Sequence, residues 1–120
     1  MTARRMWIMI AGPYTAGAST PEARAANLIE MNRAAVAVFD KGHIPIIGVN
    51  LALPMIHAAG EDHFSRLMMP LSLAVAERCD AVLRIGGAST GADDEVATFV
   101  RRGLPVFRSL SQVPLCSLQG

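Results

Sequence analysis

The sequence predicts an α/β domain in which helices cover both faces of a parallel sheet. Short apolar runs without polar alternation are typical of strands buried on both faces. These runs are separated by segments whose apolar residues recur at three- and four-residue steps, which indicates helices. Strands that alternate with helices are joined by right-handed crossovers and pair in parallel. The expected strands are residues 7–11, 43–49, 81–85 and 105–107.

The first helix has recognisable signals at both ends. Thr20 is a capping residue, Pro21 suits the first helical position, and an acid follows, so the helix is expected to begin near residue 20. Lys41 and Gly42 predict its end at about residue 41. The positions expected to face the sheet are Leu28, Met31, Ala35, Val38 and Phe39.

Three further segments complete the predicted order of elements. Residues 50–60 are expected to form a loop or a short irregular helix, because an asparagine and a proline interrupt them. From Glu61 the apolar spacing is helical, and Pro70 is expected to kink or divide that helix. Residues 92–102 are expected to form a helix that Gly103 closes.

The length and charge of the chain restrict its class. A chain of 120 residues and 12.8 kDa predicts one domain spanning residues 1–120. The net charge of +1, without a run of Lys or Arg, argues against nucleic acid or an anionic membrane as the main partner. A hydrophobic share of 52% excludes disorder and leaves apolar surface for a second subunit, so a homo-oligomer is expected.

The cysteines and the apolar segments indicate a cytoplasmic protein. Cys79 and Cys116 are too few and too far apart for a disulfide framework or a structural metal site. The apolar run at residues 6–11 is too short for a signal peptide. Prolines and histidines break the uncharged stretch at residues 42–60, so it is not expected to cross a membrane.

Two loops are expected to form the ligand site. In open parallel sheets, ligands bind beyond the carboxyl ends of the strands, where the strand order reverses. If the second strand lies beside the first and the third lies on its other side, residues 12–19 and 86–91 flank that crevice. The amides and hydroxyls of residues 86–91 suit an anion at a helix start. Alternatively, Ser89 or Thr90 simply caps the helix and the glycines form a turn.

Three acids follow this turn, and helical spacing distinguishes only one of them. The positions expected to face the sheet are Val96, Phe99 and Val100. Asp94 then points to solvent, whereas Asp93 and Glu95 both border the apolar stripe. Acids near a helix start are also favoured by the helix dipole without any function. The pattern therefore leaves the choice between Asp93 and Glu95 open.

Other side chains have both a functional and a structural interpretation. Tyr14, the only tyrosine, either stacks on a flat ligand or packs on its own helix. His43, His57 and His63 are assigned to surface or loop packing, with ligand contact by His57 or His63 as the alternative. The methionines at 55, 68 and 69 are assigned to the core or a subunit interface.

A set of short motifs lies along the chain, at residues 10–15, Asn27, 42–46, 79–82, 89–95 and 103–106. Together these motifs resemble the nucleoside 2-deoxyribosyltransferase superfamily, over about residues 6–108. The similarity is closest to its short branch with an Ala-Gly-Pro-Tyr-Thr start. The superfamily includes the 2'-deoxynucleoside 5'-monophosphate N-glycosidases. The resemblance implies a flavodoxin-like (Rossmann-like) three-layer fold with a parallel sheet of four to five strands, and active sites completed by a neighbouring subunit.

The resemblance also implies residue roles. Glu95 matches the family's nucleophile, which attacks the anomeric carbon of a deoxyribosyl group. Ser89, six positions earlier, matches the serine that contacts the 5'-phosphate in the monophosphate hydrolases. Tyr14 helps to shape the base pocket. No metal or organic cofactor is needed. The implied substrate-binding residues are Gly12, Pro13, Tyr14, Thr15, Asn27, Gly86, Gly87, Ser89, Thr90 and Gly91.

The sequence departs from the family at two positions. The acid that assists departure of the base is absent, because the corresponding positions hold Ser72 and Leu73. Glu61 or Asp62 from the preceding loop is a substitute candidate. The basic residue that helps to grip phosphate is replaced by Thr15.

The leading hypothesis is a domain that binds a nucleoside 5'-monophosphate and cleaves or transfers its N-glycosidic bond through Glu95. One alternative is a non-catalytic nucleotide-binding or sensing module that uses the same crevice. Another is an interaction subunit whose methionine-rich segment, residues 51–76, binds a partner protein.

Overall fold

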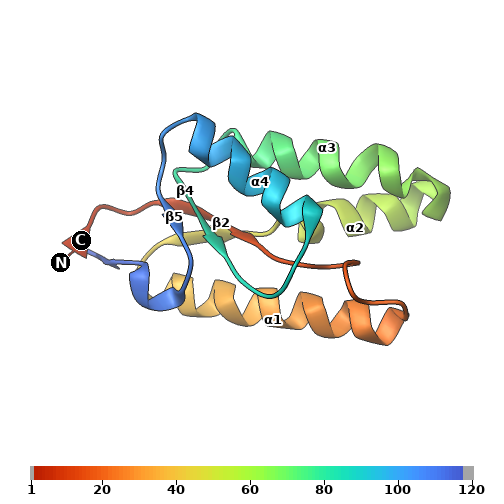
Figure 1. The fold of residues 1–120 in the computed structure, drawn as a ribbon, viewed down its shortest axis with the longest axis horizontal. Coiled ribbons are helices and arrows are strands. Elements are labelled where there is room, and N and C mark those ends of the chain that lie inside the picture. Colours follow the sequence, from red (N-terminus) through yellow and green to blue (C-terminus); the bar gives the residue numbers. More distant parts are fainter. Residues whose placement is uncertain (1, 118–120) are drawn as a thin grey trace.

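A computed structural model, which describes residues 2–117, contains one four-stranded sheet in which all strands are parallel. The strand order is β3-β2-β4-β5, as expected if the ligand crevice lies beside the first strand. The predicted flavodoxin-like or Rossmann-like three-layer fold is confirmed (Figure 1). The strands are β2 (Trp7–Ala11), β3 (Ile44–Ile46), β4 (Ala81–Arg84) and β5 (Val106–Phe107).

Four helices form the outer layers around the sheet. α1 lies on one side, and α3 and α4 lie on the other with α2 running beside α3 (Figure 1). Successive residues of β2 alternate between the two faces, so Ile8 and Ile10 pack in one core cluster and Met9 in the other. Phe99 of α4 is fully buried on the Met9 side. The helices are α1 (Pro21–Asp40), α2 (Gly48–Ala59), α3 (Phe64–Ala76) and α4 (Thr90–Arg101).

The predicted limits of α1 are confirmed. Thr20 is the N-cap, and its hydroxyl accepts a hydrogen bond from the Ala23 amide at 3.1 Å. Pro21 occupies the first turn, where its missing N–H breaks no helical bond. Gly42 follows the helix at a φ of 97°, and a Cβ there would lie 2.6 Å from Cβ of Cys116. Glycine at this position is therefore needed both for the backbone conformation and for space.

The second strand is confirmed within the predicted range 43–49 but is shorter than expected, and residues 48–59 form a full helix instead of the loop or short irregular helix expected at 50–60. The strand ends at Ile46, and α2 is a regular helix that contains Pro54. Val49, Ala52 and Ile56, at helical spacing, are buried, and this burial offsets the backbone hydrogen bond that proline removes. α3 likewise runs without interruption through Pro70, so the proline does not divide it.

Two side chains expected to face the sheet are exposed. Phe39 of α1 is 61% exposed and Val100 of α4 is 62% exposed. Each follows a residue that is fully buried, Val38 and Phe99 respectively. One residue turns a helix by about 100°, which is enough to move a side chain from the edge of the apolar stripe into solvent.

A second pair of strands, which the sequence pattern does not predict, joins the two ends of the described chain. β1 (Thr2–Ala3) pairs in parallel with β6 (Leu115–Cys116), and the ends lie side by side in Figure 1. A short 3₁₀-helix, η2 (Leu110–Gln112), precedes β6. Lys41 Nζ donates hydrogen bonds to backbone carbonyls at both ends of the η2 segment.

β1, β6 and η2 form a clasp between the two ends of the described chain, and His43 is buried at its centre. The predicted packing role of His43 in a loop is confirmed, whereas a surface position is wrong. The side chain is fully buried. Its Nδ1 accepts a hydrogen bond from the Met6 amide at 3.1 Å, which makes Nε2 the protonated nitrogen. Nε2 then donates to the carbonyl of Pro114 at 2.7 Å. One neutral imidazole therefore ties the amino-terminal segment to the carboxyl-terminal segment.

We predict that His43→Phe lowers the free energy of unfolding by about 2 to 4 kcal/mol. The substitution keeps a ring but leaves a buried amide and a buried carbonyl without partners. Urea unfolding followed by circular dichroism measures the change. The matched control is His57→Phe, because the His57 side chain is exposed and its replacement should change stability by less than about 0.5 kcal/mol. Equal unfolding free energies for the two variants would contradict the clasp.

Candidate active site

The loops after β2 and β4 pack directly against each other at the carboxyl edge of the sheet. Gly86 has a φ of 78°, and a Cβ there would lie 2.6 Å from Cδ of Pro13. A Cβ at Gly12 would lie 3.0 Å from a side-chain carbon of Ile85. Only glycine permits these approaches without displacement of the neighbouring loop. The two loops named from the sequence are thus neighbours at the expected place.

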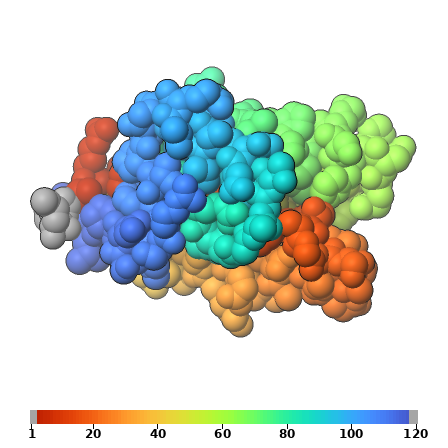
Figure 2. Space-filling view, in the orientation of Figure 1, coloured from red at the N-terminus to blue at the C-terminus, as the bar shows by residue number. Residues whose placement is uncertain are grey.

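A cavity of about 370 Å³ lies at this edge, within the range typical of small-molecule sites. Three segments surround it: the loop after β2, the inner face of α3 and the first turns of α4. Figure 2 shows these segments, in red-orange, green and cyan, meeting on one face of the molecule. The lining residues are Gly12, Tyr14, Thr15, Ala16, Val49, Phe64, Met68, Met69, Ser72, Ser89, Thr90, Gly91, Ala92 and Glu95.

Seven of the residues proposed from the sequence line this cavity, and four do not. Those that line it are Gly12, Tyr14, Thr15, Ser89, Thr90, Gly91 and Glu95. The other four have structural contacts instead. Asn27 donates a hydrogen bond to the carbonyl of Tyr14 at 2.9 Å, Pro13 packs against Gly86, and the Gly87 carbonyl accepts from Arg84. They shape the loops that carry the lining residues.

The structure separates the three acids of α4. Glu95 is 7% exposed and lines the cavity. Asp93 is exposed, and its carboxylate forms an ion pair with Arg84 at 3.2 Å. Asp94 is exposed, as the helical spacing predicted. The ambiguity between Asp93 and Glu95 is therefore resolved by burial.

Burial raises the pKa of the Glu95 carboxyl from its ordinary value of 4.5 to about 7. A hydrogen bond with Ser72 and the positive charge of Arg84 act in the opposite direction, and the nearby Asp94 carboxylate adds slightly to the rise. At neutral pH the group is thus poised between its charged and neutral forms. Such values are typical of carboxyls that take part in proton transfer or nucleophilic attack.

Arg84 was predicted only as part of an apolar strand, but its side chain holds the loop that follows β4. Its side chain is 9% exposed. The guanidinium donates hydrogen bonds to the carbonyls of Ile85 and Gly87 and to the carboxylate of Asp93. An arginine inside an otherwise apolar strand must find such partners, and that requirement was the available signal.

The start of α4 carries free hydrogen-bond donors. Ser89 is the N-cap, and its Oγ accepts from the Ala92 amide at 3.1 Å, so the capping interpretation is confirmed. Among the residues that the structure describes, the amides from Gly86 to Gly91 donate to no other backbone group. Thr90 and Gly91 line the cavity at the positive end of the helix dipole. Capping and anion binding are therefore compatible here.

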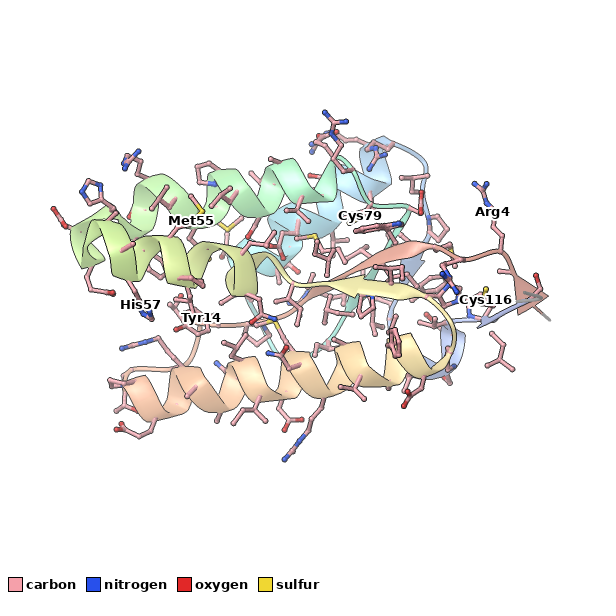
Figure 3. The ribbon with its side chains drawn as sticks, turned by 180° about the vertical axis from the view of Figure 1, so that it is seen from behind. Arg4, Tyr14, Met55, His57, Cys79 and Cys116 are labelled. Atoms are coloured by element: carbon pink, nitrogen blue, oxygen red, sulfur yellow. The ribbon has the colours of Figure 1, made fainter. Side chains whose placement is uncertain are left out.

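A second cavity of about 640 Å³ adjoins the first and shares Tyr14, Thr15 and Phe64 with it. Tyr14 and His57 lie near each other in this region (Figure 3). Glu61 lines the second cavity 3.9 Å from the His57 ring. Neither Glu61 nor Asp62 lines the cavity that holds Glu95, where Glu95 is the only acid among the described residues.

Three further features bear on metal binding, the cysteines and membranes. Within residues 2–117, no three His, Cys, Asp or Glu side chains form a group that could hold a metal ion. Cys79 and Cys116 are free and lie well apart (Figure 3). No helix of the described chain is both long enough and apolar enough to span a bilayer.

The parallel sheet, with a cavity at its carboxyl edge and a buried carboxyl beside a helix start, places the chain in the flavodoxin-like or Rossmann-like class of α/β proteins. The chain matches the family model of DUF1937, a domain of unknown function, over residues 6–110. It therefore belongs to this family. No curated protein matches the chain.

We predict that Glu95→Gln stabilises the protein at alkaline pH. The folded-state pKa is raised, so the stability associated with neutral Glu95 is complete below pH 4.5 and is lost as the pH rises through 7. Glutamine avoids this loss, and we expect the variant to exceed the wild type by about 2 to 3 kcal/mol at pH 8. The two proteins should be nearly equal at pH 4.5. Thermal unfolding over pH 4 to 9 measures the difference, and a gap that does not change with pH would contradict a raised pKa.

Proposed function

We propose that this domain binds a nucleoside 5'-monophosphate and cleaves its N-glycosidic bond with Glu95 as nucleophile. The observation that carries the proposal is one buried carboxyl, Glu95, lining the same cavity as the free amides of a helix start. The resemblance to the nucleoside 2-deoxyribosyltransferase superfamily supplies the reaction.

The phosphate would bind at the start of α4. The amides of Thr90 and Gly91 and the dipole of the 12-residue helix favour an anion there. The Ser89 hydroxyl uses a lone pair for capping and keeps its hydrogen for a phosphate oxygen. No lysine or arginine lines this cavity in the part of the chain that the structure describes, so binding depends on these neutral donors.

Glu95 would attack the anomeric carbon in its charged form. The carboxylate oxygen forms an ester bond to the sugar as the carbon–nitrogen bond breaks, and the bonding electrons leave with the base. Water or a second base then attacks the ester, releases the sugar product and restores the carboxylate. Because Glu95 is the only acid that lines the cavity among residues 2–117, the leaving base takes its proton from water, and we expect slow cleavage.

The absence of a second acid beside Glu95, among the described residues, favours an alternative function in which nucleotide is bound but not cleaved. A site with a nucleophile but no proton donor for the leaving base suits a module that binds nucleotides without consuming them. The same cavity and the same phosphate contacts serve both functions. Turnover is the property that distinguishes them.

We predict that the purified protein releases free base from at least one of the four common deoxynucleoside monophosphates. Glu95→Gln should reduce this release by several orders of magnitude, because a covalent step is lost, while nucleotide binding persists. Chromatography of the reaction mixture measures the base. Asp94→Asn is the control, since Asp94 is exposed and its loss should leave the rate unchanged.

Two results would change this proposal. Equal rates for Glu95→Gln and the wild type would remove Glu95 from the reaction. If no deoxynucleotide yields base at high protein concentration, while nucleotide still raises the unfolding temperature, the sensing function replaces the catalytic one. If nucleotides neither react nor stabilise the protein, the interaction-subunit hypothesis remains.

We also predict a homodimer or larger homo-oligomer, which exposed apolar side chains on α1 and α2 support. Ile29 and Val36 of α1 and Leu51 and Met55 of α2 are all at least 44% exposed. Val36→Asp should therefore reduce the molecular mass measured by light scattering at micromolar concentration. Val100→Asp is the matched control, because that valine is as exposed as Val36 but lies on α4, across the sheet. A monomeric wild-type protein would contradict the prediction.

A further inference from the structure

Arg84 binds three points along the segment that leads from β4 into α4 (Figure 1). It is the last residue of β4, and its side chain is 9% exposed. Nη1 donates a hydrogen bond to the carbonyl of Ile85, Nη2 donates to the carbonyl of Gly87 at 2.9 Å, and Nε donates to the carboxylate of Asp93 at 3.2 Å. One planar guanidinium therefore holds the end of the strand, the turn and the first turn of the helix.

These contacts also determine how the amides of the loop are oriented. The described residues contain no cis peptide bond, so the N–H of each peptide unit points away from its carbonyl. Because the carbonyls of Ile85 and Gly87 accept from the guanidinium, the amides of Gly86 and Ala88 point away from it. Both residues are exposed, and neither amide donates to another backbone group in the described part of the chain. Two free donors are thus turned outwards.

The positive charge of Arg84 strengthens these donors. A hydrogen bond to the carbonyl of a peptide unit polarises the N–H of the same unit, by roughly 10 to 30% per bond. The carboxylate of Asp93 neutralises the guanidinium only in part, because the aspartate side chain is 65% exposed and is screened by water, whereas the arginine is buried. The loop amides therefore retain a net positive potential.

The loop continues into the wall of the cavity that contains the proposed nucleophile. Residues 89–91 follow it directly and line this cavity together with Glu95, which is 7% exposed. Among residues 2–117, no lysine or arginine lines the cavity. An anion bound there therefore meets only neutral donors, and Arg84 is the cation held behind them.

We propose that Arg84 is a positioning residue for the phosphate-binding loop and supplies the positive charge of the site without touching the ligand. The inference rests on the proposed function, in which the start of α4 binds a phosphate group. Arginine is required rather than lysine, because a planar fork of N–H donors serves three acceptors at once. The ammonium group of a lysine is a point charge and does not hold the two carbonyls and the carboxylate in one geometry.

The first test measures the order of the loop without any ligand. Arg84→Lys keeps the charge but loses the fork, and we expect the ¹⁵N order parameters of residues 86–91 to fall from about 0.85 to below about 0.6. Arg102→Lys is the matched control, because Arg102 also donates to two backbone carbonyls, those of Ala76 and Cys79, but lies at the other end of α4. It should leave the loop unchanged. Equal order parameters in Arg84→Lys and the wild type would overturn the proposal.

The second test measures the affinity for inorganic phosphate, followed by the amide chemical shifts of residues 86–91. We expect the Kd to rise about tenfold in Arg84→Lys and further in Arg84→Met, which also loses the charge. A wild-type Kd in Arg84→Lys would overturn the positioning role. Equal Kd values in the lysine and methionine variants would overturn the contribution of the charge.

A variant at the exposed partner tests the charge without altering the buried arginine. Asp93→Ala leaves both carbonyl contacts of Arg84 in place and removes the neutralising carboxylate, so phosphate should bind several-fold more tightly. Asp94→Ala is the matched control, because it removes the same charge from the next residue, which is also exposed. Circular dichroism establishes which variants are folded. If the Arg84 variants do not fold, Asp93→Ala decides the proposal, and equal affinities for it and Asp94→Ala would overturn it.

Failure of the proposed function gives a different result. If phosphate binds as expected but no deoxynucleoside monophosphate releases base, the glycosidase function is rejected and the role of Arg84 is retained. If inorganic phosphate does not bind to the wild-type protein, the role of Arg84 at a phosphate site is overturned, whatever the order of the loop.

Discussion

Four glycines allow neighbouring segments to pack closely around the cavity, and this close packing determines the shape of the cavity. A Cβ at Gly12, Gly86 or Gly48 would meet Ile85, Pro13 or Ser72 at 3.0 Å or less, and one at Gly91 would lie 3.2 Å from the sulfur of Met69. These contacts bring the loop after β2, the start of α2, α3 and the start of α4 together. If the segments were farther apart, water would reach Glu95 and its carboxyl would behave as an ordinary surface acid.

Burial of Glu95 opposes folding above neutral pH, and the surrounding structure offsets part of this cost. Arg84 contributes a positive charge, and Ser72 contributes a hydrogen bond. Neither contribution restores the ordinary pKa of Glu95, so the charged form of this carboxyl still destabilises the folded protein. Functional sites commonly have this property, because a group that reacts readily is rarely the group that is most stable in the fold.

The sequence predicted the sheet and the location of the site because both depend on local patterns. Buried strands, the cap at Thr20 and the glycine-rich turn before α4 are all encoded within a few residues. The clasp around His43 and the close contact between Gly48 and Ser72 were not predicted, since each joins segments more than 20 residues apart. α2 was missed for a different reason: its interior proline was weighted above the burial of Val49, Ala52 and Ile56.

The choice of Glu95 over Asp93 shows how family resemblance and structure contribute separately. Helical spacing placed both acids beside the apolar stripe, and the resemblance selected Glu95. The structure adds an independent physical reason, because Asp93 is exposed and neutralised by Arg84 whereas Glu95 is buried in the cavity. The same cavity contains a hydroxyl, Ser72, where the resemblance implies a second acid. A hydroxyl can orient a carboxylate but does not readily give up a proton at neutral pH. If Glu95 acts as proposed, the site therefore favours attack on the sugar over assistance to the leaving base, and the proposed reaction suits substrates whose base departs without strong acid catalysis.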